Sequence, residues 1–250
     1  MGEEIKKPAE AKKPKTVLIA IVIVVILLIA GLAYYFVAGA GGEEKTIVFY
    51  LSTSVLSLDP MDAYDTSSFI PIQNIYDTLV GYPGEDIGNY TGVLATSWTM
   101  SPNGYFYNFT LRQDVKFSNG NDFTAEDVKF SADRNYLMDS PESGVAWILS
   151  QTVDNTSVTV IDDYHVQIQL SFPYAGFLAT IAQPFPFAIL DKEYTEAHYS
   201  DEDPYAHDFM KENPMGTGPY ELKKWEENVE TVLVKNENYW ADGRATTLTR

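Results

Sequence analysis

An uncharged apolar segment near the N-terminus constrains this chain more than any other feature. No charged residue occurs between Lys15 and Glu43, and residues 16–36 read TVLIAIVIVVILLIAGLAYYF. A helix of about 20 apolar residues is long enough to cross a bilayer. In lipid such a helix satisfies its own backbone hydrogen bonds, so the many β-branched residues do not argue against it. The segment predicts a transmembrane helix over residues 16–38.

The charges on either side of this segment predict its orientation. Residues 1–15 contain five lysines and would form a cytoplasmic basic tail, because positive charge is retained on the cytoplasmic side of the membrane. Residues 39–45 would be a short linker, and the rest of the chain would lie outside the cell. Two alternatives remain: a signal peptide cleaved near Ala38-Gly39-Ala40, whose apolar part would be unusually long, and a buried core helix.

Composition excludes several classes of function. The chain has a net charge of −18, and residues 43–250 hold 12 basic against 32 acidic residues, which argues against nucleic acid as a partner. The absence of cysteine excludes disulfides, thiolate metal sites, cysteine catalysis and a lipoprotein anchor. Three Asn-x-Ser/Thr sequences, at Asn89, Asn108 and Asn155, are compatible with an external location. With the uncleaved anchor, they suggest an archaeal surface protein.

Hydrophobic periodicity predicts a mixture of strands and helices. Buried strands or hairpins are expected at residues 46–52, 94–100 with 105–111, 158–161 with 165–170, and 219–225 with 229–236, and helices at 67–81, 175–182 and 190–197. Thr124 and Asp127 form a capping box that starts another helix, with Val128, Ala132 and Tyr136 facing inward. Without a regular βαβ rhythm, this mixture predicts an α/β or α+β fold of several lobes.

Several short motifs in this order resemble one known family. They are Leu58-Asp59-Pro60, residues 76–82 (YDTLVGY), 94–98 (LATSW), 109–112 (FTLR), 115–120 (VKFSNG), 123–128 (FTAEDV), 213–220 (NPMGTGPY) and 236–240 (NENYW). The chain from residue 46 to 250 resembles the start of a family 5 extracellular solute-binding protein, the peptide and oligopeptide receptors of ABC importers.

The resemblance implies an architecture. It implies an α/β periplasmic-binding-protein-like fold of type II, cluster C, in which two lobes meet at a hinge and a small extra domain is added. Residues 46–75 and 158–250 would belong to the first lobe and residues 76–157 to the extra domain. Members of the family are about twice as long, so the second lobe would lie outside this chain, and the solute would be held between the lobes.

Three segments are candidate solute-binding residues. The loop Ser52-Thr53-Ser54-Val55 follows a predicted strand at its carboxyl end, where open α/β sheets place ligands, and the resemblance puts it at the cleft. Gly216-Thr217-Gly218 would let a loop approach a ligand closely, although a tight turn explains it equally well. Trp147 falls where the family often presents an aromatic residue, and the alternative is a core anchor.

Other polar clusters have simpler explanations. Capping accounts for Asp122, Glu126 and Asp127 better than acid–base catalysis does, so no catalytic residue is predicted. His198, His207 and the acidic residues near them are metal-ligand types, but a solvated acidic loop is favoured and no metal or cofactor is expected. The predicted protein is a monomeric, membrane-tethered receptor for peptides that delivers them to an ABC permease. An extracellular hydrolase, a surface-layer protein, and an oligosaccharide or nickel complex as solute remain alternatives.

Overall fold

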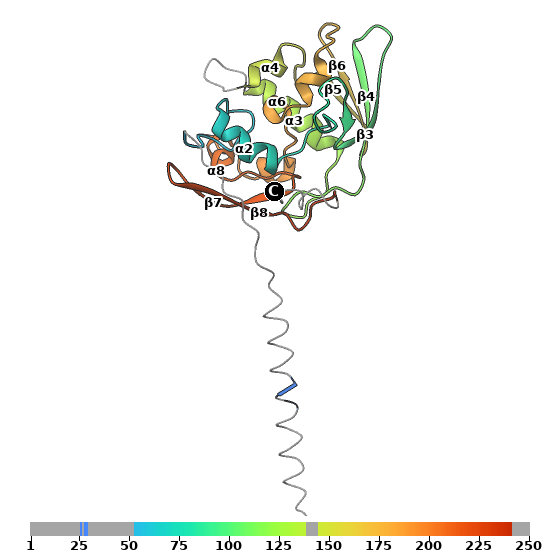
Figure 1. Cartoon of the computed structure of the whole chain (residues 1–250). Helices are drawn as coiled ribbons and strands as arrows, with labels where there is room; N and C mark the ends of the chain where they lie inside the picture. Colours follow the sequence, from blue (N-terminus) through green and yellow to red (C-terminus); the bar gives the residue numbers. More distant parts are fainter. Residues whose placement is uncertain (1–25, 27, 30–52, 139–144, 242–250) are drawn as a thin grey trace, which may run out of the picture. The chain divides into compact units, whose positions relative to one another are not determined.

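The computed structural model describes residues 26, 28, 29, 53–138 and 145–241 (Figure 1). The chain divides into two compact units, Met1–Phe49 and Tyr50–Arg250. The basic tail, most of the predicted membrane helix, the linker and the predicted strand at 46–52 lie outside the described residues, so these predictions stay predictions. Among the described residues, no helix has the length and apolar character needed to cross a membrane.

The second unit mixes short helices with antiparallel strands. In chain order its elements are α2 (Thr66–Ile75), β1 (Val80–Gly81), β2 (Thr91–Gly92), β3 (Ala95–Met100), β4 (Phe106–Leu111), α3 (Ala125–Leu137), α4 (Ala146–Ser150), β5 (Val158–Asp162), β6 (His165–Gln169), α5 (Phe177–Ile181), α6 (Pro184–Phe187), α7 (Lys192–Glu196), α8 (His207–Glu212), β7 (Tyr220–Glu226) and β8 (Glu230–Lys235).

The largest sheet has the strand order β3-β4-β6-β5 with every pair antiparallel. The hairpins predicted at residues 94–111 and 158–170 are confirmed. In β4 the alternation places Tyr107, Phe109 and Leu111 in the core, as period-two patterning requires. Phe109 lies opposite Val166 on β6. This sheet joins strands on both sides of residue 157, where the boundary between extra domain and first lobe was expected, and that division stays a prediction.

Helix α2 is shorter than predicted. It begins after Asp65, whose carboxylate accepts from the Ser68 N–H, and ends at Ile75 rather than near residue 81. Tyr76 is extended, and β1 follows at once and pairs with β2. Leu79 and Val80 follow Ile75 at a spacing that also fits a helix. They are buried, but they lie in an extended segment. Periodicity alone does not separate the two cases.

Helix α3 begins where the capping box predicted, and the Asp127 carboxylate accepts from the Thr124 N–H at 2.8 Å. Val128 and Ala132 face the core as predicted, but Tyr136 is 38% exposed, so that part of the prediction is wrong. The buried side of α3 also includes Arg134 and Asn135, which turns residue 136 toward solvent. The helix thus separates the sheet core from a second core, formed around α2, α8 and the hairpin β7–β8.

Candidate binding surface

The loop of residues 53–65 is held in place by backbone hydrogen bonds from several elements. The Ser68 hydroxyl at the start of α2 accepts from the N–H groups of Leu56 and Ser57, at 3.0 and 3.2 Å. The Leu58 N–H donates to the carbonyl of Lys211 on α8 at 3.0 Å. A loop fixed in this way presents its outer side chains without a large entropic cost of ordering on binding.

The first residues of this loop differ in what they offer a ligand. Thr53 is exposed, and its hydroxyl is hydrogen-bonded to that of Ser67. Ser54 is partly exposed and donates its hydroxyl proton to Asn228 Oδ1, at 2.6 Å, in the β7–β8 turn. Val55 is buried in the second core, and Ser52 lies outside the described residues. Of the described residues 53–55, Thr53 and Ser54 therefore carry the polar side chains that solvent can reach.

Exposed apolar side chains lie on the loop and on the neighbouring helix α4. Leu56 is 56% exposed and Tyr64 is 68% exposed, although sequence reasoning singled out neither residue. Trp147 on α4 is 46% exposed rather than a core anchor. Val145, the residue just before α4, donates its N–H to the Met61 carbonyl of the loop at 3.5 Å. We call Leu56, Tyr64 and Trp147, with the Thr53 and Ser54 hydroxyls, the loop surface.

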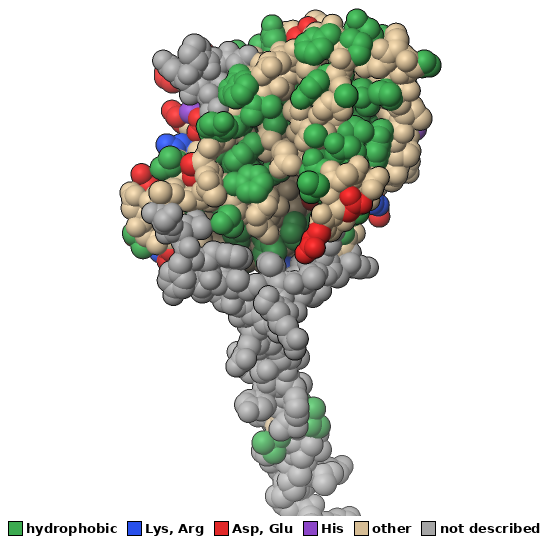
Figure 2. Space-filling view, turned by 45° about the horizontal axis from the view of Figure 1, so that its top comes forward, with side chains coloured by type: hydrophobic (Ala, Val, Ile, Leu, Met, Phe, Trp, Pro, Cys, Tyr) green, Lys and Arg blue, Asp and Glu red, His purple; other side chains and the backbone are tan. Residues whose placement is uncertain are grey.

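The space-filling view, in which the end of the unit that carries α4 comes forward, shows many hydrophobic side chains at the surface (Figure 2). They lie among uncharged polar groups, and few lysine or arginine side chains interrupt them (Figure 2). Solute sites generally require mostly apolar contact with a few placed polar groups, and the loop surface offers both kinds of group.

The Gly216-Thr217-Gly218 segment is buried against the end of α2. A Cβ atom at Gly216 would lie 2.1 Å from the carbonyl oxygen of Ile75, and one at Gly218 would lie 2.6 Å from that of Asn74. The Gly218 N–H donates to the Ile75 carbonyl at 2.9 Å, and Thr217 has no exposed surface. Both glycines are thus in close contact with the protein's own backbone at the end of α2.

This segment is part of a buried junction between distant stretches of the chain. Asp77 Oδ2 accepts from the hydroxyl of Thr217 at 3.2 Å and from the Trp240 indole N–H at 2.9 Å. The guanidinium of Arg112 lies 4.4 Å from the centroid of the Trp240 ring, a cation–π contact. The Asn236 side-chain amide donates to the carbonyl of Gly218 at 2.8 Å. Four of the recognised motifs therefore meet here as a structural junction.

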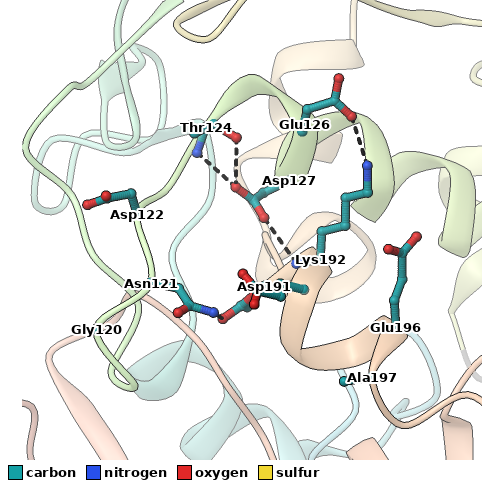
Figure 3. A pocket seen from close by; sticks show the side chains of 11 residues that line it. Gly120, Asn121, Asp122, Thr124, Glu126, Asp127, Asp191, Lys192, Glu196 and Ala197 are labelled. Carbon is teal, nitrogen blue, oxygen red and sulfur yellow. Dashed lines mark hydrogen bonds and ion pairs between the residues drawn. The ribbon is translucent and has the colours of Figure 1, made fainter.

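The acidic residues at the start of α3 line a hollow shared with α7 (Figure 3). One oxygen of Asp127 accepts from Thr124 and the other from the Lys192 N–H at 3.0 Å, while Glu126 forms an ion pair with Lys192 (Figure 3). Asp191 accepts from the Tyr194 N–H at the start of α7. Burial raises the pKa of Asp127 to about 6, against the opposing effect of these hydrogen bonds. Asp191 accepts in addition from the side-chain amides of Asn119 and Asn121, at 2.7 and 2.9 Å, so it also joins α7 to the loop before α3.

The stretch around His198 and His207 also has structural partners. The Asp203 carboxylate accepts from three backbone N–H groups at the start of α8, among them that of His207 at 2.6 Å. His207 Nε2 lies 3.2 Å from Asp62 Oδ1, and the His198 ring stacks on Phe209 with centroids 3.6 Å apart. Within residues 53–138 and 145–241, no group of three or more His, Asp or Glu side chains is placed to hold a metal ion.

Comparison with known proteins defines the class to which this fold and surface belong. The model of the bacterial extracellular solute-binding proteins, family 5 middle region, matches residues 89–249. The glutathione-binding protein GsiB of Salmonella paratyphi A is 32% identical over 200 residues, which are 80% of this chain and 36% of that protein. The chain belongs to the family 5 solute-binding proteins.

Solved structures agree with this assignment. The periplasmic binding protein DppA of Helicobacter pylori, in complex with the peptide STSA, is 31% identical, with a TM-score of 0.65 over 76% of this chain and 38% of that one. NikA of Brucella suis, in complex with Fe(III)-EDTA, is 30% identical, with a TM-score of 0.62 over 77% and 36% of the two chains. The fold is therefore periplasmic-binding-protein-like, and this chain spans little more than a third of its relatives' length.

Proposed function

We propose that this chain is part of an extracytoplasmic receptor that captures a peptide and delivers it to the permease of an ABC importer. The observation that carries the proposal is family membership. Among the relatives, one is named for glutathione, one holds the tetrapeptide STSA, and a dipeptide-binding protein of Pseudoalteromonas holds Met-Leu. All three are short peptides, and all three proteins are binding proteins rather than enzymes by name.

In this proposal the loop surface forms one wall of the solute site. The rigid loop of residues 53–65 offers hydroxyls at Thr53 and Ser54 for polar groups of a peptide, and Trp147 and Tyr64 offer flat apolar contact. The opposite wall would come from the second lobe of the whole protein, which closes over the solute by a hinge motion. Gly216 and Gly218 would act indirectly, because they fix the end of α2 rather than touch the solute.

The apolar N-terminal segment, residues 16–38, would tether the receptor to the membrane with its basic tail in the cytoplasm. A tether raises the effective concentration of the receptor at its permease without any new contact between them. Protease treatment of intact cells tests the orientation, because the tail of residues 1–15 should be protected while the rest of the chain is digested. Digestion of an epitope placed in the tail would contradict the tether.

Thermal unfolding of the whole natural protein tests the proposed function. The panel contains glutathione, di- to tetrapeptides, oligosaccharides and nickel(II)–histidine, so that the family's other solute classes are compared directly. A ligand at about 100 times its Kd stabilises the folded state by about 2.7 kcal/mol, which should raise the melting temperature by several degrees. We expect a peptide to give the largest rise. A flat response to the entire panel would refute solute capture.

A further inference from the structure

The three Asn-x-Ser/Thr sequences are not used by the binding surface, and the structure places them in three different environments. Asn108 is half-buried on the central strand β4, where its side-chain oxygen accepts from Gln167 on β6 at 2.8 Å. In the ladder it lies opposite Thr99 on one side and Gln167 on the other. A large substituent on this amide would compete with the cross-strand hydrogen bond to Gln167, which disfavours modification there.

Asn155 and Thr156 are exposed, but Ser157, the hydroxyl residue of this acceptor sequence, is buried. The hydroxyl of Ser157 donates to Asp154 Oδ1 at 3.1 Å and accepts from the Asp154 N–H at 2.9 Å, and Ser157 is 6% exposed. This turn leads directly into β5 and is closed by its own hydrogen bonds. The hydroxyl that an acceptor sequence must present is therefore occupied in the folded state.

Asn89 differs from both, because it lies in a fully exposed loop between β1 and β2. Every residue from 83 to 89 is exposed, and Ile87 in this loop is 80% exposed. The Asn89 amide donates to Asp86 Oδ2 at 2.8 Å, a hydrogen bond between two exposed groups that water can replace at little cost. Thr91 is partly exposed on the two-residue strand β2.

The two ends of this loop pack on a different core from the loop of residues 53–65. The rings of Tyr82 and Tyr90 are 5.4 Å apart and pack on the core around the large sheet, whereas Val55, Leu58 and Met61 belong to the second core. A bulky group at Asn89 would extend into solvent from a loop in which residues 83–89 are all exposed. Modification of this loop is therefore compatible with solute binding.

We propose that Asn89 is an N-glycosylation site and that Asn108 and Asn155 are not modified in the folded protein. The co-reactant is a lipid-diphosphate-linked oligosaccharide, used by a membrane transferase outside the cytoplasm. The amide nitrogen of Asn89 forms a bond to the anomeric carbon of the sugar, the bond from that carbon to the phosphate oxygen breaks, and the lipid diphosphate leaves. The amide nitrogen loses one proton, and nothing is oxidised or reduced.

Intact mass spectrometry of the whole protein, produced in its natural cells, tests this assignment. We expect the wild type to be heavier than Asn89→Gln by one glycan. Thr91→Ala should lose the same mass, whereas Thr91→Ser, which keeps the acceptor sequence, should not. Asn108→Gln and Asn155→Gln are matched controls that should keep the full excess mass.

Two results would overturn the proposal. One is a glycan mass that is the same in wild type and Asn89→Gln, zero included, and the other is a glycan that is lost in Asn108→Gln or Asn155→Gln. Because the readout is a mass rather than binding, it does not depend on whether the proposed solute is correct. Solute-induced stabilisation should be the same in wild type and Asn89→Gln.

Discussion

Arg134 Nη2 lies 2.6 Å from Asp59 Oδ2, and neither side chain has any exposed surface. A second hydrogen bond joins Nη1 to Oδ1 at 3.0 Å, and the Nε–H donates to the Tyr205 carbonyl at 2.8 Å. This bidentate pair ties the loop of residues 53–65 to α3 and to the segment before α8. With the hydrogen bonds to Ser68 and Lys211, it fixes the loop of residues 53–65 relative to the core.

Removal of one partner from this pair should be strongly destabilising. Asp59→Ala leaves the Arg134 charge buried without compensation, and we expect a loss of about 3–5 kcal/mol in the free energy of unfolding. Urea titration of the whole protein measures it. The exposed pair of Lys116 and Asp122 supplies the control, because Asp122→Ala should cost less than about 1 kcal/mol.

If Asp59→Ala does not fold, the double variant Asp59→Leu with Arg134→Met decides the question. It removes both charges, and replacement of a buried ion pair by apolar residues is often neutral or stabilising. We expect it to fold and to recover most of the lost stability. Equal stability of Asp59→Ala and Asp122→Ala would contradict the role given to the pair.

The glycines of the buried junction should be intolerant of any side chain. Gly216→Ala or Gly218→Ala would place a Cβ within 2.1 or 2.6 Å of a carbonyl oxygen near the end of α2, and neither side of that contact can rotate away. Overpacking of this kind costs about 1–3 kcal/mol or more. Chemical denaturation compares these variants with Gly88→Ala, where a Cβ would meet only the exposed Asp86 side chain at 3.3 Å. If Gly216→Ala lowers the stability no more than Gly88→Ala does, the backbone contact at Gly216 is not tight.

The hairpins were predictable from the sequence because their cause is local. Alternation of Tyr107, Phe109 and Leu111 places one face in the core whatever the rest of the chain does. The capping box at Thr124 is likewise complete within four residues. The end of α2 was not predictable, because buried residues after Ile75 satisfy a helical and an extended pattern equally.

The candidate site was less predictable than the fold, because its contacts are distant in the chain. Gly218 could be assigned to a turn or to a ligand, and only its hydrogen bond to Ile75, more than 140 positions earlier, shows the packing role. Leu56 and Tyr64 carry no sequence signal at all. Their exposure depends on which parts of the folded chain cover the loop. The residue pattern of the loop itself does not specify those contacts.

Asp127 should make the stability of the protein depend on pH. Its folded pKa of about 6 is above the ordinary value of 3.8, so between these values the folded state binds more protons than the unfolded state. The stabilisation that this residue gives is therefore complete below pH 3.8 and is lost as the pH rises through 6. The size of the effect is about 3 kcal/mol.

The comparison of wild type with Asp127→Asn isolates this contribution. The variant does not titrate, so the difference in unfolding free energy, wild type minus variant, should fall between pH 4 and 6 and stay constant above pH 7. Glu126→Gln is the matched control, since Glu126 sits one residue earlier and is exposed. Parallel stability curves for wild type and Asp127→Asn would show that the carboxyl group is not perturbed.

The proposed solute site predicts a separation of binding from stability at Trp147. This side chain is 46% exposed, so Trp147→Ala should lower the melting temperature of the unliganded protein less than truncation of a fully buried aromatic residue would. If the ring contacts the peptide, its loss should weaken binding about tenfold, equivalent to about 1.4 kcal/mol. Calorimetric titration with the peptide that gives the largest thermal shift measures the change. Ile161→Ala, which alters an apolar residue on β5 that is 59% exposed, should leave the affinity unchanged. The same affinity in all three proteins would place the peptide away from α4, whereas equal weakening by both variants would indicate a general loss of folding rather than a contact.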